Sequence, residues 1–330
     1  MENPFVVDRP VVGEEHCGRE PVLEWLVAAA LRGAPAAAAG QRGGGVTSLA
    51  RELGRRLAAG GLRPILVDAA GRPSAASLLA DARAALGEEA GEGGYHLILD
   101  GLGRGGDLEG REELAAARDE GFGVTALWQG TASPAEGPLA PGAGADPDDG
   151  AGGSAEIGPV PLAAWLPHVL ELFLETDRWI ANEQVERAVE VTGGRPLHAG
   201  LLFHLLWEEA DEGGAVDEEA MARARRRLLV RAGARLRLLL DPLTANQARL
   251  LEALARDEPP VRPYASSFVR EHGFASPSSV QRALEALREE GLVEESGQGP
   301  RPADPVLAAW LARPRARRME EREEGAEHLP

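Results

Sequence analysis

The chain has 330 residues and a formal net charge of −18, and all 35 of its Lys+Arg residues are arginine. Its length predicts two or three domains, its acidity argues against indiscriminate binding to nucleic acid, and its single cysteine excludes a disulfide framework or a CxxC metal site. Because no apolar stretch of about 18 residues escapes charge or proline, and no cationic segment precedes an apolar one at the N-terminus, we expect a cytoplasmic protein without a membrane span.

Short apolar runs alternate with helical patterns in the first half, which is typical of a parallel sheet layered with helices. The expected strands are residues 34–39, 65–68, 95–100 and 124–128, with a weaker fifth strand near Ile157. Residues 47–59, 74–86 and 108–119 carry apolar side chains at helical spacing. The first strand is assigned only from its place before a glycine-rich turn, because alanine is depleted in strands. Residues 134–154 are almost wholly Pro, Ala, Gly, Asp and Glu, which predicts a flexible loop.

The chain after this loop is expected to be helical. Helices are predicted at 163–175, Asn182–Thr192, 196–210 and 217–240. Three more are expected at Ala245–Arg256, 266–272 and 278–290, with Thr244 and Ser276 as N-caps. A strand and turn over 292–299 complete the winged helix-turn-helix plan. We therefore expect an α/β domain at 1–160, a helical lid at 161–241, a winged-helix domain at 242–312 and a charged, solvated tail at 313–330.

A glycine-rich loop lies between the first predicted strand and the next helix. It consists of Gly40, Gln41, Arg42, Gly43, Gly44, Gly45, Val46, Thr47 and Ser48. Its frame is that of the phosphate-binding loop G-x-x-x-x-G-[Lys]-[Ser/Thr], with Val46 at the lysine position. In such a loop, backbone N–H groups hold phosphates and the Thr47 hydroxyl binds Mg²⁺. The alternative is a turn before a helix without a ligand, since chance matches are common in a chain with 41 glycines.

Further motifs occur in a specific order along the chain. They are Asn3-Pro4-Phe5, Cys17-Gly18-Arg19-Glu20, the glycine loop, Leu97-Ile98-Leu99-Asp100, Gln129-Gly130-Thr131, Gly194-Arg195-Pro196, Leu243-Thr244-Ala245-Asn246-Gln247, and Asp304-Pro305-Val306-Leu307 with Trp310. Over about residues 3–312 this order resembles the AAA+/STAND-type P-loop ATPases, particularly the archaeal-ATPase and origin-recognition-like group. The resemblance implies a P-loop NTPase-like parallel α/β sheet, a helical lid and a winged helix, with ATP or ADP and Mg²⁺ as cofactors.

The same resemblance implies roles for individual residues. It places residues 40–48, Arg195 and Pro196 at a nucleotide, Thr47 and Asp100 at Mg²⁺, and Thr131 as a sensor. Two departures remove charge: Val46 replaces the phosphate-binding lysine, and Gly101 replaces the acidic residue that follows the Walker B aspartate. Losing one charge-assisted hydrogen bond costs about 1.5–3 kcal/mol, which weak binding can survive. Losing both groups argues against hydrolysis, so we expect a pseudo-ATPase.

Four of these residues keep two interpretations. Arg42 either reaches a phosphate or is a solvated loop arginine. Asp100 either binds Mg²⁺ or caps the end of its strand. Arg195 either faces a nucleotide or is a surface arginine at a helix start. Arg19 is either a nucleotide contact or a member of a structural ion pair.

Two groups of residues are candidates for binding DNA or a protein. Arg223, Arg227, Arg231 and Arg235 recur every four residues, so they share a helical face that either grips phosphates or acidic protein or is simply solvated. On the expected recognition helix, Ser278, Ser279, Gln281, Arg282 and Arg288 can meet phosphates and base edges. Acidic neighbours would repel DNA: Glu285, Glu289, Glu290, Glu294 and Glu295. His198 and His204 lack the spacing of a shared metal face.

These observations favour a degenerate AAA+/STAND-like regulator or scaffold. It would bind ATP or ADP weakly and engage a protein, or double-stranded DNA, through its winged helix. Self-association is compatible with this role, and no membrane partner is expected. One alternative is a slow ATPase completed by arginines or by oligomerisation. The other is a DNA-binding regulator whose NTPase-like half is purely structural.

Overall fold

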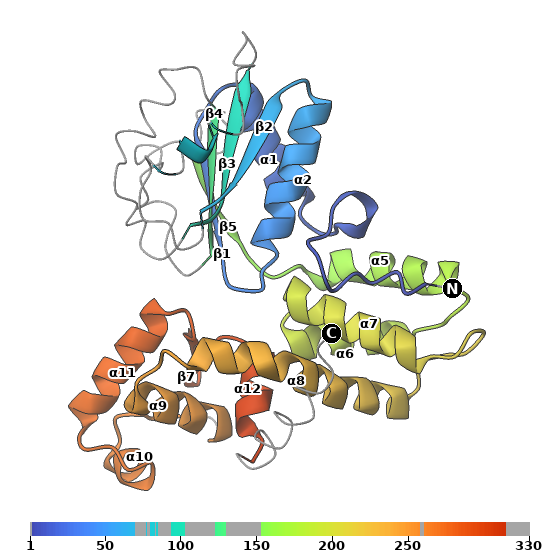
Figure 1. Ribbon diagram of the computed structural model, residues 1–330. Coiled ribbons are helices and arrows are strands. Elements are labelled where there is room, and N and C mark those ends of the chain that lie inside the picture. Colours follow the sequence, from blue (N-terminus) through green and yellow to red (C-terminus); the bar gives the residue numbers. More distant parts are fainter. Residues whose placement is uncertain are drawn as a thin grey trace. The chain divides into compact units, whose positions relative to one another are not determined.

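The computed structural model describes residues 2–69, 77, 80–82, 84, 94–102, 123–129, 153–257 and 261–314. They form two compact units, one comprising Val6–Ala164 and the other Met1–Phe5 with Trp165–Pro330 (Figure 1). The predicted helix at 108–119 lies outside the described residues. Of the predicted helix at 74–86, residues 77, 80–82 and 84 are described, and these are helical. The tail beyond residue 314 also lies outside them.

The α/β unit is built on a five-stranded parallel sheet in the order β2-β3-β4-β1-β5. The strands are β1 (Ala36–Gly40), β2 (Arg63–Asp68), β3 (Tyr95–Leu102), β4 (Gly123–Gln129) and β5 (Gly153–Ile157). All five predicted strands are therefore confirmed. One expectation needs correction, because Gly153 and Ser154, the end of the predicted loop at 134–154, begin β5. They do so because β5 pairs with β1 from Ala36 and Gly153 onward.

The alanine strand β1 lies inside the sheet, between β4 and β5. Each of its five residues is buried. Parallel strands covered on both faces need apolar side chains rather than alternation, and alanine meets that need despite its low strand propensity. Burial between two neighbours therefore decides the conformation of this segment.

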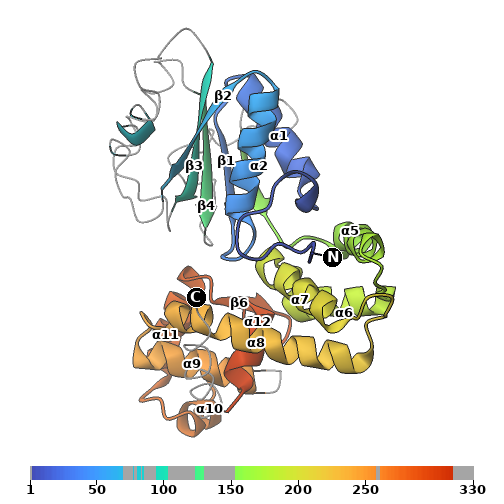
Figure 2. The same cartoon turned by 45° about the vertical axis from the view of Figure 1, so that its right-hand side comes forward.

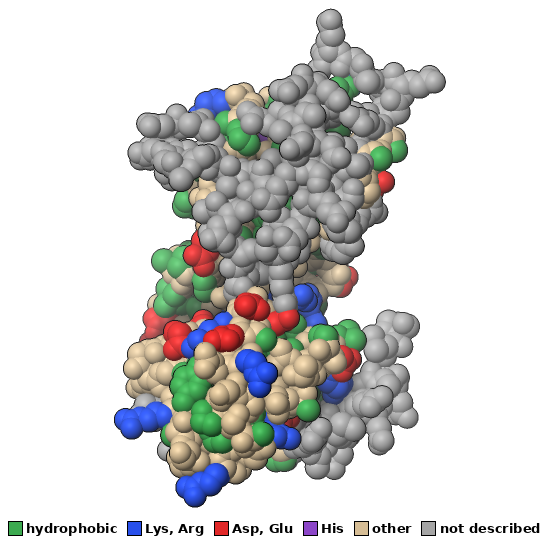
Figure 3. Space-filling view, turned by 90° about the vertical axis from the view of Figure 1, so that its left-hand side faces the viewer, with side chains coloured by type: hydrophobic (Ala, Val, Ile, Leu, Met, Phe, Trp, Pro, Cys, Tyr) green, Lys and Arg blue, Asp and Glu red, His purple; other side chains and the backbone are tan. Residues whose placement is uncertain are grey.

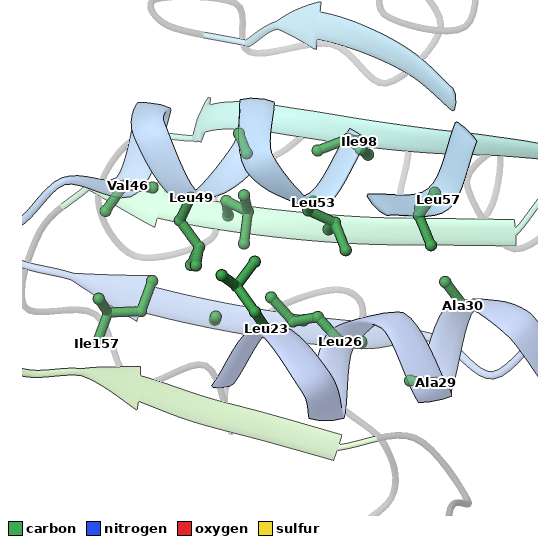
Figure 4. Close-up of a cluster of buried hydrophobic side chains, with 14 residues drawn as sticks. Leu23, Leu26, Ala29, Ala30, Val46, Leu49, Leu53, Leu57, Ile98 and Ile157 are labelled. Atoms are coloured by element: carbon green, nitrogen blue, oxygen red, sulfur yellow. The ribbon is translucent and has the colours of Figure 1, made fainter. Parts of the chain in front are cut away.

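Two helices, α1 (Glu20–Leu31) and α2 (Val46–Ala59), pack on one face of the sheet. Leu23 and Leu26 of α1 meet Leu49 and Leu53 of α2 in a buried cluster that also includes Ile98 of β3 (Figure 4). Helix α1 was not predicted, because its sequence is almost continuously apolar and shows little helical periodicity. A short 3-10 helix, η1 (Gly13–Glu15), precedes it.

The helices that follow β5 along the chain lead into the second unit (Figure 2). They are α5 (Leu162–Glu175, which starts at the division between the units), α6 (Asn182–Thr192), α7 (Pro196–Glu209) and α8 (Glu218–Leu240). Gly193 ends α6 at φ 61°, a left-handed conformation that glycine commonly adopts after the last residue of a helix. The N-terminal residues belong to this unit, since Phe5 packs against Phe173 and Phe203 with ring centroids 5.6 and 5.8 Å apart.

A winged helix completes this unit. It consists of α9 (Ala245–Arg256), α10 (Ser266–Glu271), α11 (Pro277–Glu289), the antiparallel strands β6 (Val293–Ser296) and β7 (Gly299–Pro302), and α12 (Pro305–Ala312). Thr244 and Ser276 accept hydrogen bonds from backbone N–H groups at the starts of α9 and α11, as expected of N-caps. The predicted fold class is confirmed. Among the described residues, no helix combines the length and apolarity needed to cross a bilayer.

Candidate functional site

The backbone of the loop between β1 and α2 requires its glycines. Gly43 and Gly45 adopt φ values of 77° and 82°, which glycine tolerates and other residues rarely do. The N–H of Gly44 donates to the carbonyl of Gln41 at 2.9 Å. A Cβ on Gly44 would lie 2.7 Å from that same oxygen. The loop is therefore a tight turn that brings the chain directly from a strand end into a helix.

The N-terminus of α2 lacks a capping side chain. Its N-cap residue is Gly45, which provides no side-chain acceptor for the first N–H groups. The positive end of a helix of 14 residues thus follows the glycine turn, and no side chain of the described residues caps its first N–H groups, which are donors of the kind that bind anions.

Val46 cannot perform the phosphate-binding role of a lysine at this position, because its side chain is part of the hydrophobic core. It is 3% exposed and lies in one buried cluster with Leu49, Leu53 and Ile157 (Figure 4). A Cβ on Gly40 would meet Val46 Cγ2 at 3.0 Å, so the space around this side chain is filled. Position 46 therefore contributes apolar packing and no charge.

Thr47, Asp100 and Gln129 come together from α2, β3 and β4. Gln129 Nε2 donates to Thr47 Oγ1 at 3.2 Å. Burial raises the pKa of Asp100, the hydrogen bond with Thr47 opposes this, and the charge of Asp68 adds to the rise. Oδ1 of Asp100 is buried with no hydrogen-bond partner among the described residues. Thr47 and Asp100, both predicted as Mg²⁺ ligands, therefore lie within hydrogen-bond distance of each other. A part for Gln129 was not predicted, and the register of Gly40 opposite Gln129 is its structural basis.

These residues fit a magnesium ion. A hydroxyl and a carboxylate are hard oxygen ligands, and Mg²⁺ is commonly held by one or two carboxylates together with substrate phosphates and water. The orphaned Oδ1 of Asp100 is the atom that a cation would satisfy. No group of three or more His, Cys, Asp or Glu side chains arranged for a metal occurs in the described part of the chain.

Gly101 adopts a backbone conformation that suits glycine. Its φ is 79°, and the pairing of β3 with β4 shifts register between Asp100 and Leu102. A glutamate at this position would have to adopt the left-handed region, which costs about 1–2 kcal/mol for a residue with a Cβ. The departure from the ATPase pattern is thus built into the backbone.

Arg19 lies behind the loop. Its side chain donates from Nη2 to the carbonyl of Gly44 at 2.8 Å, and the residue is 7% exposed. Burial lowers the pKa of its guanidinium. The ion-pair interpretation is not supported, because no carboxylate forms an ion pair with this side chain among the described residues.

The remaining loop residues have different environments. Arg42 is exposed, and Gln41 is half-buried. The hydroxyl of Ser48 accepts from the N–H of Val11 at 3.2 Å, which ties α2 to the segment before η1. Thr131, predicted as a sensor, lies outside the described residues.

Arg195 and Pro196 belong to the other unit. Pro196 is the first residue of α7. Arg195 is 8% exposed and donates from Nη2 to the carbonyl of Ala303 at 2.6 Å, just before α12. It is therefore a buried residue that joins the start of α7 to the winged helix, and the expectation of a surface arginine is wrong.

The arginine face of α8 is largely paired with acidic residues of α7. Arg223 and Arg227 contact Glu209 at 2.6 and 2.8 Å. Arg227 also contacts Glu208 at 2.5 Å, and Arg231 lies 3.9 Å from it. Arg235 is exposed and has no ion-pair partner among the described residues. Most of this stripe thus joins two helices.

The predicted residues of the recognition helix α11 fall into two groups. Ser278, Gln281 and Arg282 are exposed. Ser279 donates its hydroxyl hydrogen to the carbonyl of Ser276 within the cap, and Arg288 is paired with Glu295 of the wing.

The acidic wing is partly neutralised by these contacts. Glu294 is paired with Arg301 at 2.7 Å, and Glu295 with Arg288. Figure 3 shows the side of the unit that carries α10 and α11, with separated arginines among uncharged side chains and acidic ones gathered along its upper edge. The expected repulsion of DNA by Glu294 and Glu295 is therefore reduced by local pairing.

The two histidines of α7 have separate partners. Nδ1 of His198 lies 3.4 Å from a carboxylate oxygen of Asp304, and His204 contacts the carbonyl of Phe5 at 2.8 Å and Glu208 at 3.1 Å. These contacts join α7 to Asp304 and to the N-terminal segment.

Comparison with known proteins supports the architecture. Residues 235–313 match the family model of a probable winged helix domain. The Walker-type ATPase PABY2304 of Pyrococcus abyssi aligns with a TM-score of 0.66 over 93% of this chain and 99% of that one, at 17% identity. The chain therefore shares the fold of this Walker-type ATPase and carries a winged helix at residues 235–313.

Two further solved structures align at lower scores. They are the RuvB Holliday junction branch migration motor of Thermotoga maritima (TM-score 0.49, 17% identity, 89% of this chain and 95% of that one) and Cdc6p of Pyrobaculum aerophilum (TM-score 0.44, 13% identity, 98% of each chain). No curated protein matches the chain significantly in sequence. At these identities the likenesses describe the fold alone.

Proposed function

We propose that this protein is a nucleotide-binding regulator or scaffold that holds ADP or ATP with Mg²⁺ weakly and hydrolyses ATP little or not at all. The proposal rests on a contrast between groups that could bind phosphate and Mg²⁺, which are present, and the phosphate-binding lysine, which is absent. The glycine turn and the pair of Thr47 with Asp100 are retained, while the lysine position is committed to the core.

The electrostatics support binding without turnover. The N–H groups at the start of α2 suit a phosphate, and Asp100 has an orphaned buried oxygen for a cation. Phosphoryl transfer additionally needs charge against the transferred group and a positioned water. Val46 provides no charge, and the conformation of Gly101 disfavours the acidic residue that would polarise water.

The test is calorimetric titration of the full chain with ADP and ATP, with and without Mg²⁺, beside a phosphate-release assay. We expect measurable binding that is about tenfold to a few hundredfold weaker than the lysine would allow. Thr47→Ala and Asp100→Asn should each remove the Mg²⁺-dependent part of the affinity. Phosphate release should stay at background.

Thr244→Ala is the matched control, because it removes a threonine hydroxyl that caps α9 in the other unit. It should cost about 1 kcal/mol of stability and leave nucleotide affinity unchanged. Robust turnover abolished by Thr47→Ala would contradict the non-catalytic part of the proposal, and turnover that rises with protein concentration would favour an ATPase completed by assembly. Absence of any nucleotide binding would leave the α/β unit a purely structural role.

We further propose double-stranded DNA as a partner of the winged helix. The favouring observation is that Arg262, Arg270 and Arg282 have no carboxylate partner among the described residues, although the wing's Glu294 and Glu295 do have arginine partners. Arg282 lies on α11 with Ser278 and Gln281, and its Nε donates to the Ser278 carbonyl at 3.4 Å. An arginine with exposed polar neighbours suits phosphates and base edges.

An electrophoretic shift assay with duplex DNA over a salt series tests this partner. Arg282→Gln should weaken binding and reduce the dependence of affinity on salt. Arg301→Gln removes an equal charge from an arginine that is already paired with Glu294, so its effect should be smaller. Absence of a shift at low salt would exclude DNA and leave a protein as the partner.

A further inference from the structure

Arg19 is a buried cation that forms no ion pair with a carboxylate of the described residues. Its side chain makes one hydrogen bond among the described residues, to the carbonyl of Gly44. A neutral carbonyl compensates a guanidinium only in part, and an uncompensated buried charge is costly to a fold. An anion bound nearby would supply the missing charge.

The hydrogen bond also sets the direction of the loop's central peptide. In a planar trans peptide the C=O and the N–H point in opposite directions. Because Arg19 holds the Gly44 oxygen, the N–H of Gly45 points away from the guanidinium. No described residue accepts a hydrogen bond from that N–H.

A second observation points to a ligand at the same loop. Asp100 is 8% exposed, its Oδ1 has no hydrogen-bond partner among the described residues, and its side chain hydrogen-bonds Thr47. An orphaned carboxylate oxygen beside a phosphate-type loop fits a cation that accompanies a polyphosphate.

We propose that Arg19 supplies, from behind the loop, the positive charge that Val46 cannot, and that the loop thereby binds the polyphosphate group of a nucleotide. This inference rests on the proposed nucleotide binding and adds the positioning residue on which it depends. Arg19 acts in two ways: it orients the Gly44–Gly45 peptide, and its charge lowers the cost of bringing phosphate oxygens to the unpaired N–H groups of α2.

The experiment compares two variants of Arg19 that separate charge from hydrogen bonding. Arg19→Lys keeps the charge, whereas Arg19→Gln keeps a donor for the Gly44 carbonyl and loses the charge. The probes are ADP and inorganic pyrophosphate, titrated calorimetrically into the full chain at several salt concentrations. Arg63→Gln is the control, because it removes an equal charge from the start of β2, at the opposite edge of the sheet from the loop.

We expect Arg19→Gln to weaken both probes at least about tenfold and to flatten the salt dependence, with Arg19→Lys within about threefold of the wild type. Arg63→Gln should leave both affinities unchanged. Equal affinities of Arg19→Gln and the wild type would overturn the inference while nucleotide binding stands. Equal losses in the Lys and Gln variants would also overturn it, since they would show that geometry alone matters.

A measurement on the wild type keeps the inference testable if Arg19→Gln does not fold. The Nε–Hε resonance of Arg19, assigned through Arg19→Lys, should shift during a pyrophosphate titration with the same Kd as the calorimetry. An unmoved resonance at saturation would overturn the inference. If the wild type binds neither ADP nor pyrophosphate, the proposed nucleotide binding fails, and the inference fails with it.

Discussion

At the scale of single residues, two substitutions in the ATPase pattern differ in their physical cause. At position 46 packing favours an apolar residue, because the Val46 side chain is buried against side chains of α2 and β5. At position 101 the backbone conformation favours glycine, because its φ of 79° lies in a region where residues with a Cβ are strained. Restoring the charged residue at either position therefore conflicts with the surrounding structure.

Val46→Lys should destabilise the α/β unit without creating ATPase activity. The lysine stem would replace a buried valine, and its ammonium would lose hydration unless it forced the loop apart. We expect a loss of at least about 2 kcal/mol in the free energy of unfolding, measured by urea denaturation. Val46→Ile is the control, with a smaller effect from overpacking. Unchanged stability together with ATP turnover would contradict the assignment of Val46 to the core.

Gly101→Glu should likewise lower stability, by about 1–2 kcal/mol, because a Cβ is unfavourable in the left-handed region. Gly101→Asn is the matched comparison, since asparagine visits this region more readily than glutamate. We expect Asn to be the less destabilising of the two in thermal unfolding. If Glu and Asn cost the same, φ at position 101 is not the cause.

At the scale of elements, a buried histidine links two strands. Nε2 of His96 in β3 lies 2.8 Å from Oγ1 of Thr125 in β4. A Cβ on Gly123 would lie 2.3 Å from the ring, so β4 must begin with glycine. Burial lowers the pKa of His96 from 6.5 to about 4. The folded sheet therefore contains His96 with an uncharged imidazole at neutral pH.

This depressed pKa predicts loss of stability in acid. The histidine contributes fully above pH 6.5, and the contribution is lost as pH falls from 6.5 to about 4, because only the unfolded chain binds the proton there. The maximal loss is about 3 kcal/mol. Urea denaturation at pH 7, 5.5 and 4 should show His96→Gln losing less stability than the wild type. Parallel profiles would contradict a neutral buried His96.

At the scale of the whole molecule, the units do not follow the order of the sequence. Residues 1–5 belong with the helical unit, although the α/β unit follows them in the chain. Asn3 donates from Nδ2 to the carbonyl of His204 at 3.0 Å, and Phe5 is 5% exposed. The N-terminus is therefore part of the core around α5 and α7.

Phe5→Ala should destabilise the helical unit by about 3–5 kcal/mol, as expected for an aromatic removed from a core. Hydrogen exchange should speed up for the amides of α5 and α7 more than for those of β1 and β3. Val7→Ala is the control, since Val7 is 38% exposed and should cost less than about 0.5 kcal/mol. Equal exchange in both variants would show that Phe5 does not hold this core.

Features set by residues close together in the sequence could be predicted, whereas contacts between distant residues could not. The parallel strands, the helix starts at Thr244 and Ser276 and the winged helix were predictable, because apolar spacing, caps and turns act over a few residues. Helix α1 was not, because a continuously apolar helix shows no periodicity. The sequence indicated Arg19 as a candidate but not its partner.

The sequence by itself determined the class of fold, the position of the glycine loop and the absence of its lysine. Only the tertiary structure decided where Arg19, Arg195 and the arginines of α8 make their contacts. Arg19 and Gly44 are 25 residues apart, and Arg195 and Ala303 are 108 apart. Such pairs leave no periodic signal, because their geometry exists only after sheets and helices have packed.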